Sequence, residues 1–170
     1  MYFFSKGVFH MVFSFLKKGK IKVYAPVNGS IIPLEEVPDP VFSQKMMGEG
    51  IAMVPSGGNI HSPVNGTVML IAATKHALGI RADDGTEILI HVGLETVSLN
   101  GKGFRLTINQ GDKISIGQKL MEVDWEYINK HAKSIVTPIV ITNSQDGKKQ
   151  YTLTAEKSAV QGKTVIITGS

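Results

Sequence analysis

Two histidines stand out because each lies where an apolar run meets a turn. His91 ends the run in TEILIHVGLE, residues 86–95, and His76 opens the preceding run in TKHALGI, residues 74–80. A lone histidine in such a place is usually a core residue whose ring is satisfied by the backbone. Two neutral imidazoles on one surface could instead bind a metal or attack phosphorus. The question is therefore whether the two rings share a face.

The segment between the histidines predicts a β-hairpin. A two-residue turn at Asp84–Gly85 would place Leu78 opposite His91. His76 would then lie opposite Gly93. Both histidines would project from the same face as diagonal neighbours, with backbones about 7–8 Å apart. A three-residue turn would place them on opposite faces.

A histidine pair in an apolar setting supports two chemistries. Zinc binds neutral imidazole, but a catalytic zinc takes three protein ligands and no third is evident. His61 and His131 are remote in sequence, and Glu95 is the nearest carboxylate. Phosphoryl transfer needs only the pair, because one ring attacks phosphorus while the other stabilises the phosphoryl oxygens. The sequence has no Walker loop, so we expect a donor protein rather than ATP.

The elements that must position the histidines are predicted to be short strands. Runs rich in Ile and Val are separated by Pro, Gly, Asn and Asp roughly every 8 to 12 residues, which predicts an all-β antiparallel sandwich or barrel. The runs are IKVYAPV, NGSIIPL, GTVMLIAA, TEILIHV, KISIGQKLMEV, IVTPIVIT and KTVIITG. One short helix is predicted in DWEYINKHAKS, with Asp124 as its cap and Trp125, Ile128 and Ala132 on one side.

An internal repeat supports this fold class. YAPVNGSI, residues 24–31, and HSPVNGTV, residues 61–68, use the same turn twice, which indicates a duplicated sandwich motif. The segment INQGDKISIGQKLMEVD is similar in sequence to segments of lipoyl and biotinyl carrier domains. Those carriers present a modified lysine on a tight hairpin, whereas Lys45 lies in a loop without that symmetry. A swinging-arm carrier is therefore disfavoured.

Composition and charge exclude several classes. A chain of 170 residues, 42% hydrophobic and 19% charged, suits one globular domain. The sequence has no cysteine, which excludes disulfides, thiolate nucleophiles and cysteine-based zinc sites and is compatible with a reducing cytosol. The net charge of +4 comes from four lysines in the first 20 residues, Lys6, Lys17, Lys18 and Lys20. The rest of the chain is neutral, so nucleic-acid binding is disfavoured.

Residues 1–20 are interpreted as a leader. The apolar run is too short and interrupted to span a bilayer, and no signal-peptide cleavage site follows it. Apolar residues recur at helical spacing ahead of the lysines, which would suit an anionic membrane surface. The alternative is a disordered or non-native leader, with Met11 as the natural start. The apolar residues are Phe9, Val12, Phe13 and Leu16.

Several motifs, in order, resemble the glucose-type IIA component of the bacterial phosphoenolpyruvate-dependent sugar phosphotransferase system. They are VPDPVFSQKMMGEG, HSPVNGTV, TKHALGI, TEILIHVGLETV, LNGKGF and AKSIVTPIVITN. The resemblance implies a flattened antiparallel β sandwich of the duplicated hybrid type over residues 21–145. The resemblance does not explain residues 146–170, which we interpret as a C-terminal extension whose Val-Ile-Ile run predicts a last strand. The implied activity is phosphotransfer, from the histidine-containing phosphocarrier protein to the IIB domain of a sugar permease.

The resemblance also assigns roles to residues. His91 would accept the phosphoryl group on its outer ring nitrogen, His76 would assist, and the Thr74 hydroxyl would orient His76. An apolar patch around the site would bind both protein partners, and methionine suits a surface that accepts more than one partner. The patch residues would be Val41, Phe42, Met46, Met47, Leu78 and Val92.

The resemblance implies no required cofactor, although His76 and His91 could bind a zinc ion completed by a partner's carboxylate. The protein would be cytoplasmic, with peripheral membrane contact through the leader. Relatives often carry Phe at the positions of Ala72 and Leu78 and Asp at that of Glu95, so the shape of the patch could differ here.

Two other classes of protein could use the same fold or the same apolar face. The lysostaphin-like zinc peptidases share the duplicated sandwich but need a His-x-His pair, which IHVG does not provide. A non-catalytic regulator that binds other enzymes through the same apolar face is the stronger alternative. It predicts partner binding that depends on phosphorylation, without loss of phosphate acceptance.

Overall fold

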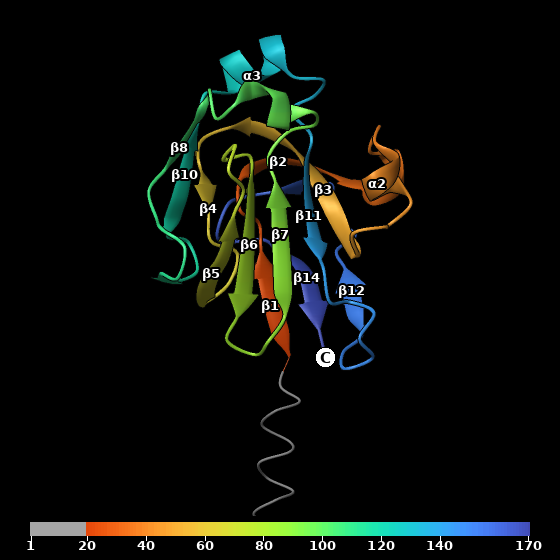
Figure 1. The fold of residues 1–170 in the computed structure, drawn as a ribbon. Helices are drawn as coiled ribbons and strands as arrows, with labels where there is room; N and C mark the ends of the chain where they lie inside the picture. The colour runs from red at the N-terminus through yellow and green to blue at the C-terminus, as the bar shows by residue number, and fades with distance from the viewer. Residues whose placement is uncertain (1–19) are drawn as a thin grey trace, which may run out of the picture.

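The computed structural model describes residues 20–170, which fold into antiparallel β sheets with a few short helices (Figure 1). Apart from Lys20, the predicted leader lies outside the described residues. Among residues 20–170, no helix has the length and hydrophobicity needed to cross a bilayer.

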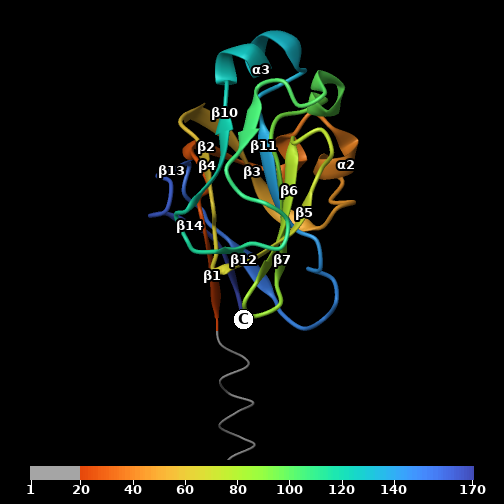
Figure 2. The same ribbon diagram turned by 60° about the vertical axis from the view of Figure 1, so that its left-hand side comes forward.

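The strands of residues 20–170 are β1 Ile21–Tyr24, β2 Asn28–Pro33, β3 Glu49–Gly57, β4 Ile60–His61, β5 Gly66–Ile71, β6 Ala77–Ala82, β7 Glu87–His91, β8 Phe104–Leu106, β9 Lys113–Ile114, β10 Lys119–Val123, β11 Thr137–Ile141, β12 Tyr151–Leu153, β13 Ser158–Ala159 and β14 Val165–Gly169. They form one large sheet with the order β13-β2-β3-β11-β7-β6-β5-β9 and two small sheets with the orders β1-β14-β12 and β4-β10-β8. In the turned view, β1, β4, β10 and β14 lie in one layer and β5, β6, β7 and β11 in the other, so the predicted flattened sandwich is confirmed (Figure 2).

The predicted helix is present as α3, Trp125–His131, with the Asp124 carboxylate accepting from the Tyr127 N–H. A second helix, α2, Pro40–Ser43, was not predicted, because four residues are too few to show helical periodicity. Its local signal is the Asp39–Pro40 pair, in which an N-cap acid precedes a proline at the first helical position. Two 3₁₀ turns complete the set, η1 Leu34–Glu36 and η2 Thr96–Leu99.

The internal repeat is visible in the backbone. The Tyr24 N–H donates to the Pro63 carbonyl, and the His61 N–H donates to the Pro26 carbonyl, at 2.9 and 2.8 Å. Each copy of the repeat therefore donates a backbone hydrogen bond from its first residue to the proline carbonyl of the other copy. This reciprocity supports the predicted duplication.

The glycine of each repeat lies where a side chain has no room. A Cβ at Gly29 would lie 2.2 Å from the Val54 carbonyl oxygen, and one at Gly66 would lie 2.2 Å from the Arg81 carbonyl oxygen. In both copies the neighbouring strand approaches the glycine too closely for any other residue.

We expect Gly29→Ala to lower the free energy of unfolding by roughly 1–3 kcal/mol, because the clash is with backbone that cannot move alone. Urea unfolding of the full chain would measure the loss. Ser30→Ala, at an exposed position of the same strand, is the matched control. Equal unfolding midpoints for the two variants would contradict the prediction.

The C-terminal segment is part of the same body. Where the sequence predicted one last strand after residue 145, the structure has β12, β13 and β14. Ile166 and Ile167 are fully buried in the main core. β14 lies between β1 and β12, so this segment completes the small sheet that begins at residue 21.

The β6–β7 hairpin carries the predicted site, and both of its faces are buried near the site. One face, with Leu78 and Ile90, packs in the main core. The other, with Ala77 and Leu89, packs in a second cluster that includes Phe42. The hairpin therefore forms a rigid support between two apolar layers.

The predicted turn length of this hairpin is wrong. The loop is residues 83–85, with the Ala82 N–H donating to the Thr86 carbonyl at 2.8 Å. Gly85 has φ +94°, the left-handed conformation usual for the last residue of a three-residue hairpin loop. Ala77 therefore pairs with His91, which the prediction had placed opposite Leu78.

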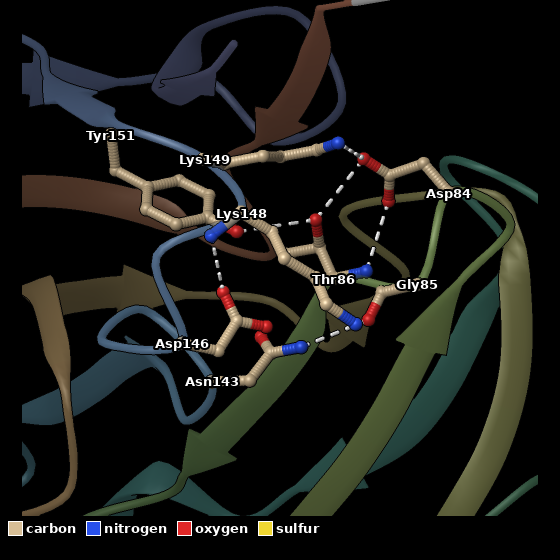
Figure 3. Close-up of a pocket in the computed structure, with 8 residues that line it drawn as sticks. All are labelled: Asp84, Gly85, Thr86, Asn143, Asp146, Lys148, Lys149 and Tyr151. Atoms are coloured by element: carbon tan, nitrogen blue, oxygen red, sulfur yellow. Dashed lines mark hydrogen bonds and ion pairs between the residues drawn. The ribbon is translucent and has the colours of Figure 1, made fainter. Parts of the chain in front are cut away.

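Polar side chains from the segment after β11 form hydrogen bonds and an ion pair with this turn (Figure 3). The Asn143 amide donates to the Gly85 carbonyl at 3.0 Å and accepts from the Glu87 N–H at 2.9 Å. The Lys149 ammonium lies 3.2 Å from the Asp84 carboxylate, and both side chains are largely shielded from solvent. These contacts, made by residues more than 50 positions away, stabilise the three-residue loop and with it the register of the hairpin.

Candidate active site

His91 is the last residue of β7, and its ring has a defined tautomer. Its Nδ1 lies 2.8 Å from the Gly93 carbonyl oxygen. A carbonyl can only accept, so Nδ1 carries the proton and Nε2 keeps its lone pair. The neutral ring therefore presents a nucleophilic Nε2.

His76 lies beside His91. The two ring centroids are 4.8 Å apart with the planes at 76°, an edge-on arrangement. The Thr74 hydroxyl oxygen lies 2.6 Å from Nδ1 of His76, which fixes the orientation of that ring. The three residues that the resemblance assigned to the reaction are thus brought together.

Both Nε2 atoms face outward. No hydrogen bond within residues 20–170 occupies Nε2 of His76 or His91, and the described part of the chain has no buried side-chain nitrogen without a partner. Both atoms are therefore accessible from solvent, as an acceptor and an assisting group for a protein-bound phosphoryl group must be.

The rings meet for a different reason than the one predicted. Because Ala77 pairs with His91, a regular strand would place His76 on the opposite face, as expected for a three-residue turn. His76, however, precedes β6 and lies in a bend with Lys75. The bend turns the ring toward His91, so the prediction of a shared surface is right although its register is wrong.

Phe42 forms one wall of the site. Its ring centroid lies 5.0 Å from that of His91 at 58°, and its side chain is buried. α2 holds it there, capped by the Asp39 carboxylate, which accepts from the Val41 N–H at 3.0 Å. Asp39 was not among the predicted site residues, although its charge reaches His91.

The electrostatics keep both rings neutral. Burial lowers the pKa of His91, opposed by its hydrogen bond to Gly93 and by the negative charge of Asp39. Burial, and to a lesser extent the neighbouring His91, lowers the pKa of His76 to about 4. A neutral imidazole is the form that attacks phosphorus, so the site is ready at neutral pH without loss of a proton.

We expect both rings to protonate below pH 6.5, the ordinary histidine value, with His76 protonating near pH 4. Since both histidines of the unfolded chain protonate near 6.5, the free energy of unfolding should be at its full value above that pH and should fall as the pH drops below it, for His76 down to about pH 4. Ring-nitrogen chemical shifts measured against pH would follow each histidine. A His76 ring that titrates at or above 6.5 would contradict the prediction.

The predicted apolar patch is divided by the structure. Val41, Met46 and Met47 are exposed, with Met46 at 68%, whereas Leu78 and Val92 are fully buried. The last two were wrong as surface residues, because the one-residue change in register directs Leu78 into the main core. The accessible apolar face lies on α2 and the loop that follows it.

A metal ion at this site would need ligands from outside residues 20–170. The two imidazoles supply two ligands, and within residues 20–170 no group of three or more His, Cys, Asp or Glu side chains is placed to hold an ion. A tetrahedral zinc takes four ligands. The pair fits zinc only where another molecule supplies the remaining ligands.

Comparisons with known proteins show the family of this chain. The family model for the phosphoenolpyruvate-dependent sugar phosphotransferase system, EIIA 1, matches residues 21–147. A glucose-specific EIIA component from Staphylococcus epidermidis is 48% identical over 147 residues, which cover 86% of this chain and 88% of that protein. One from Staphylococcus aureus is 44% identical over the same shares.

A solved structure shows the same fold. The glucose permease IIA from Mycoplasma capricolum superposes with a TM-score of 0.80 at 39% identity, covering 88% of this chain and 96% of that one. The family model, the curated relatives and the solved structure together show that the chain belongs to the EIIA 1 family of the phosphoenolpyruvate-dependent sugar phosphotransferase system, the glucose-type IIA components.

Proposed function

We propose that this protein relays a phosphoryl group through Nε2 of His91 during sugar uptake. The donor is the histidine-containing phosphocarrier protein, and the acceptor is the IIB domain of a sugar permease. The observation that carries the proposal is the neutral, outward-facing Nε2 of His91 beside a second neutral ring at 4.8 Å. The names of the relatives make glucose the first sugar to test.

The transfer exchanges one phosphorus–nitrogen bond for another. The Nε2 lone pair attacks phosphorus, the bond to the donor's histidine breaks, and the electron pair returns to that ring. Nδ1–H of His91 keeps its hydrogen bond to the Gly93 carbonyl, which stabilises the positive charge that develops on the ring. In onward transfer His91 is the leaving group: a nucleophile of the IIB domain attacks phosphorus, the bond from phosphorus to Nε2 of His91 breaks, and its electron pair returns to the His91 ring.

His76 stabilises the phosphoryl oxygens. If the Thr74 hydroxyl donates to Nδ1 of His76, the ring proton is on Nε2, where it can be donated to a phosphoryl oxygen on His91. Because the ring is partly desolvated, that hydrogen bond acts where water screens it little. The relay needs no cofactor, since nucleophile and assisting group both belong to the chain.

The exposed face formed by Val41, Met46 and Met47 is the proposed docking surface for both partners. Flexible methionine side chains can repack against two different proteins. The relay works on the cytoplasmic side of the membrane, where the permease's IIB domain must receive the group. A zinc ion at the histidine pair would require a carboxylate from such a partner.

The direct test is acid-labile phosphorylation of the purified protein with phosphoenolpyruvate, enzyme I and the phosphocarrier protein. We expect stoichiometric label on the folded chain. Absence of label, with folding verified by circular dichroism, would overturn the relay and favour a regulator that binds through the same face.

Thr74→Val should leave acceptance by His91 nearly unchanged and slow onward transfer roughly 2- to 10-fold, the value of one hydrogen bond. The hydroxyl that orients His76 is lost while the shape of the side chain is kept. Thr74→Ser, which retains the hydroxyl, is the matched control. Rapid-quench measurement of transfer to the IIB domain compares the two, and equal rates would show that the hydroxyl is not needed.

A further inference from the structure

The ring of His76 lies on the wrong face for a regular strand. The Val92 N–H donates to the His76 carbonyl at 2.7 Å, so the antiparallel ladder continues one pair beyond Ala77 and His91. Val92 is fully buried in the main core. A regular strand would send the side chain of His76 into that core with Val92, away from His91.

The backbone at Lys75 departs from regular geometry. Lys75 has φ +62°, the left-handed conformation that non-glycine residues rarely adopt. Its N–H donates to the Ala72 carbonyl at 2.8 Å and closes a turn over residues 72–75, so that His76 alone separates this turn from β6. The same turn brings Thr74 to 2.6 Å from Nδ1 of His76, although the two residues are only two positions apart.

The side chain of Lys75 does not explain this conformation. It is exposed, its stem lies along Gly101, and none of the ion pairs in the described residues includes it. Strained backbone that persists at an active site is commonly there because the site needs the geometry. The part of Lys75 that matters is therefore its φ angle.

We propose that Lys75 is a positioning residue, whose left-handed backbone turns His76 off the core face of the β6–β7 hairpin and onto the face of His91. The backbone conformation of Lys75 fixes the direction in which the His76 ring points. The same turn places the Thr74 hydroxyl beside Nδ1 of that ring. The consequence for phosphoryl transfer rests on the proposed function. The placement of the ring does not.

The test compares three full-length variants with the wild type. Lys75→Val disfavours the left-handed region, because a branched Cβ clashes there, while Lys75→Gly removes the same charge and enters that region freely. Asn100→Val is the matched control for strain, since Asn100 also has a positive φ, +52°, at the end of η2. Nuclear Overhauser contacts between the His76 and His91 rings report the geometry directly.

We expect Lys75→Val to lose the contact between the rings and to slow onward transfer by about 10²-fold, with acceptance by His91 retained. Lys75→Gly should keep both, and Asn100→Val should keep the ring contact despite its strain. Ring contacts that persist in Lys75→Val, or that are lost equally in Lys75→Gly, would overturn the proposal. If Lys75→Val does not fold, Lys75→Ala replaces it, and we expect the same loss of ring contact and the same slower onward transfer.

The proposed relay and the proposed positioning role of Lys75 can be overturned independently of each other. A wild-type protein that takes no label would overturn the relay, but the ring contacts of the Lys75 variants would still decide the positioning role. A normal relay with unchanged contacts in Lys75→Val would overturn the positioning role alone.

Discussion

Replacing His91 with Ala should reduce acid-labile phosphorylation by the phosphocarrier protein to the background of the assay. The substitution removes the ring whose Nδ1–H donates to the Gly93 carbonyl and whose Nε2 lies free beside a second neutral ring in the described part of the chain. No other group in residues 20–170 combines these properties. Removing the nucleophile itself costs more than any change to the groups around it.

The control for this variant is His131→Ala. His131 is the last residue of α3, and its ring centroid lies 4.3 Å from that of Tyr127. Among residues 20–170, no hydrogen bond or ring–ring contact joins it to His76 or His91. It should be labelled like the wild type. Because the His91 ring also packs against Phe42, its loss could affect folding. Circular dichroism and urea unfolding are therefore used to verify that His91→Ala is folded. Retained label in a folded His91→Ala protein would place the acceptor elsewhere.

Replacing His76 with Gln should leave His91 able to accept a phosphoryl group but slow its transfer to the IIB domain by about 10²–10³-fold. Loss of one preorganised donor to a developing negative charge has an effect of this size. Gln can donate a hydrogen bond, but it cannot reproduce an imidazole fixed at Nδ1 by Thr74 and packed edge-on against His91. Single-turnover transfer from labelled protein to the purified IIB domain isolates the affected step.

The matched control is His61→Gln, a change of the same kind at a half-buried histidine whose Nδ1 bonds to the Asn59 carbonyl. It should transfer at the wild-type rate. Onward transfer by His76→Gln at the wild-type rate would remove His76 from the mechanism. A parallel loss of acceptance would instead show that His76 is needed to bind or activate the donor.

Much of the fold follows from local sequence pattern. Short runs rich in Ile and Val between turn residues predict strands such as β7. The repeated turn sequence predicts the duplication, which the reciprocal backbone hydrogen bonds support. α3 could be predicted because its cap, Asp124, and its buried residue, Ile128, lie within one short segment. The identity of the two histidines and Thr74 also came from linear motifs, which the resemblance to a family made specific.

What the tertiary structure decided is the geometry of the site. The hairpin loop has three residues, fixed by contacts from Asn143 and Lys149, and no local pattern encodes contacts so distant. That one-residue difference places Leu78 in the main core, on the opposite face of the hairpin from His91. His76 reached His91 only through the left-handed turn at Lys75. The sequence by itself determined which residues carry the chemistry, whereas long-range packing determined how they meet, because register is set by the whole sheet and not by one strand.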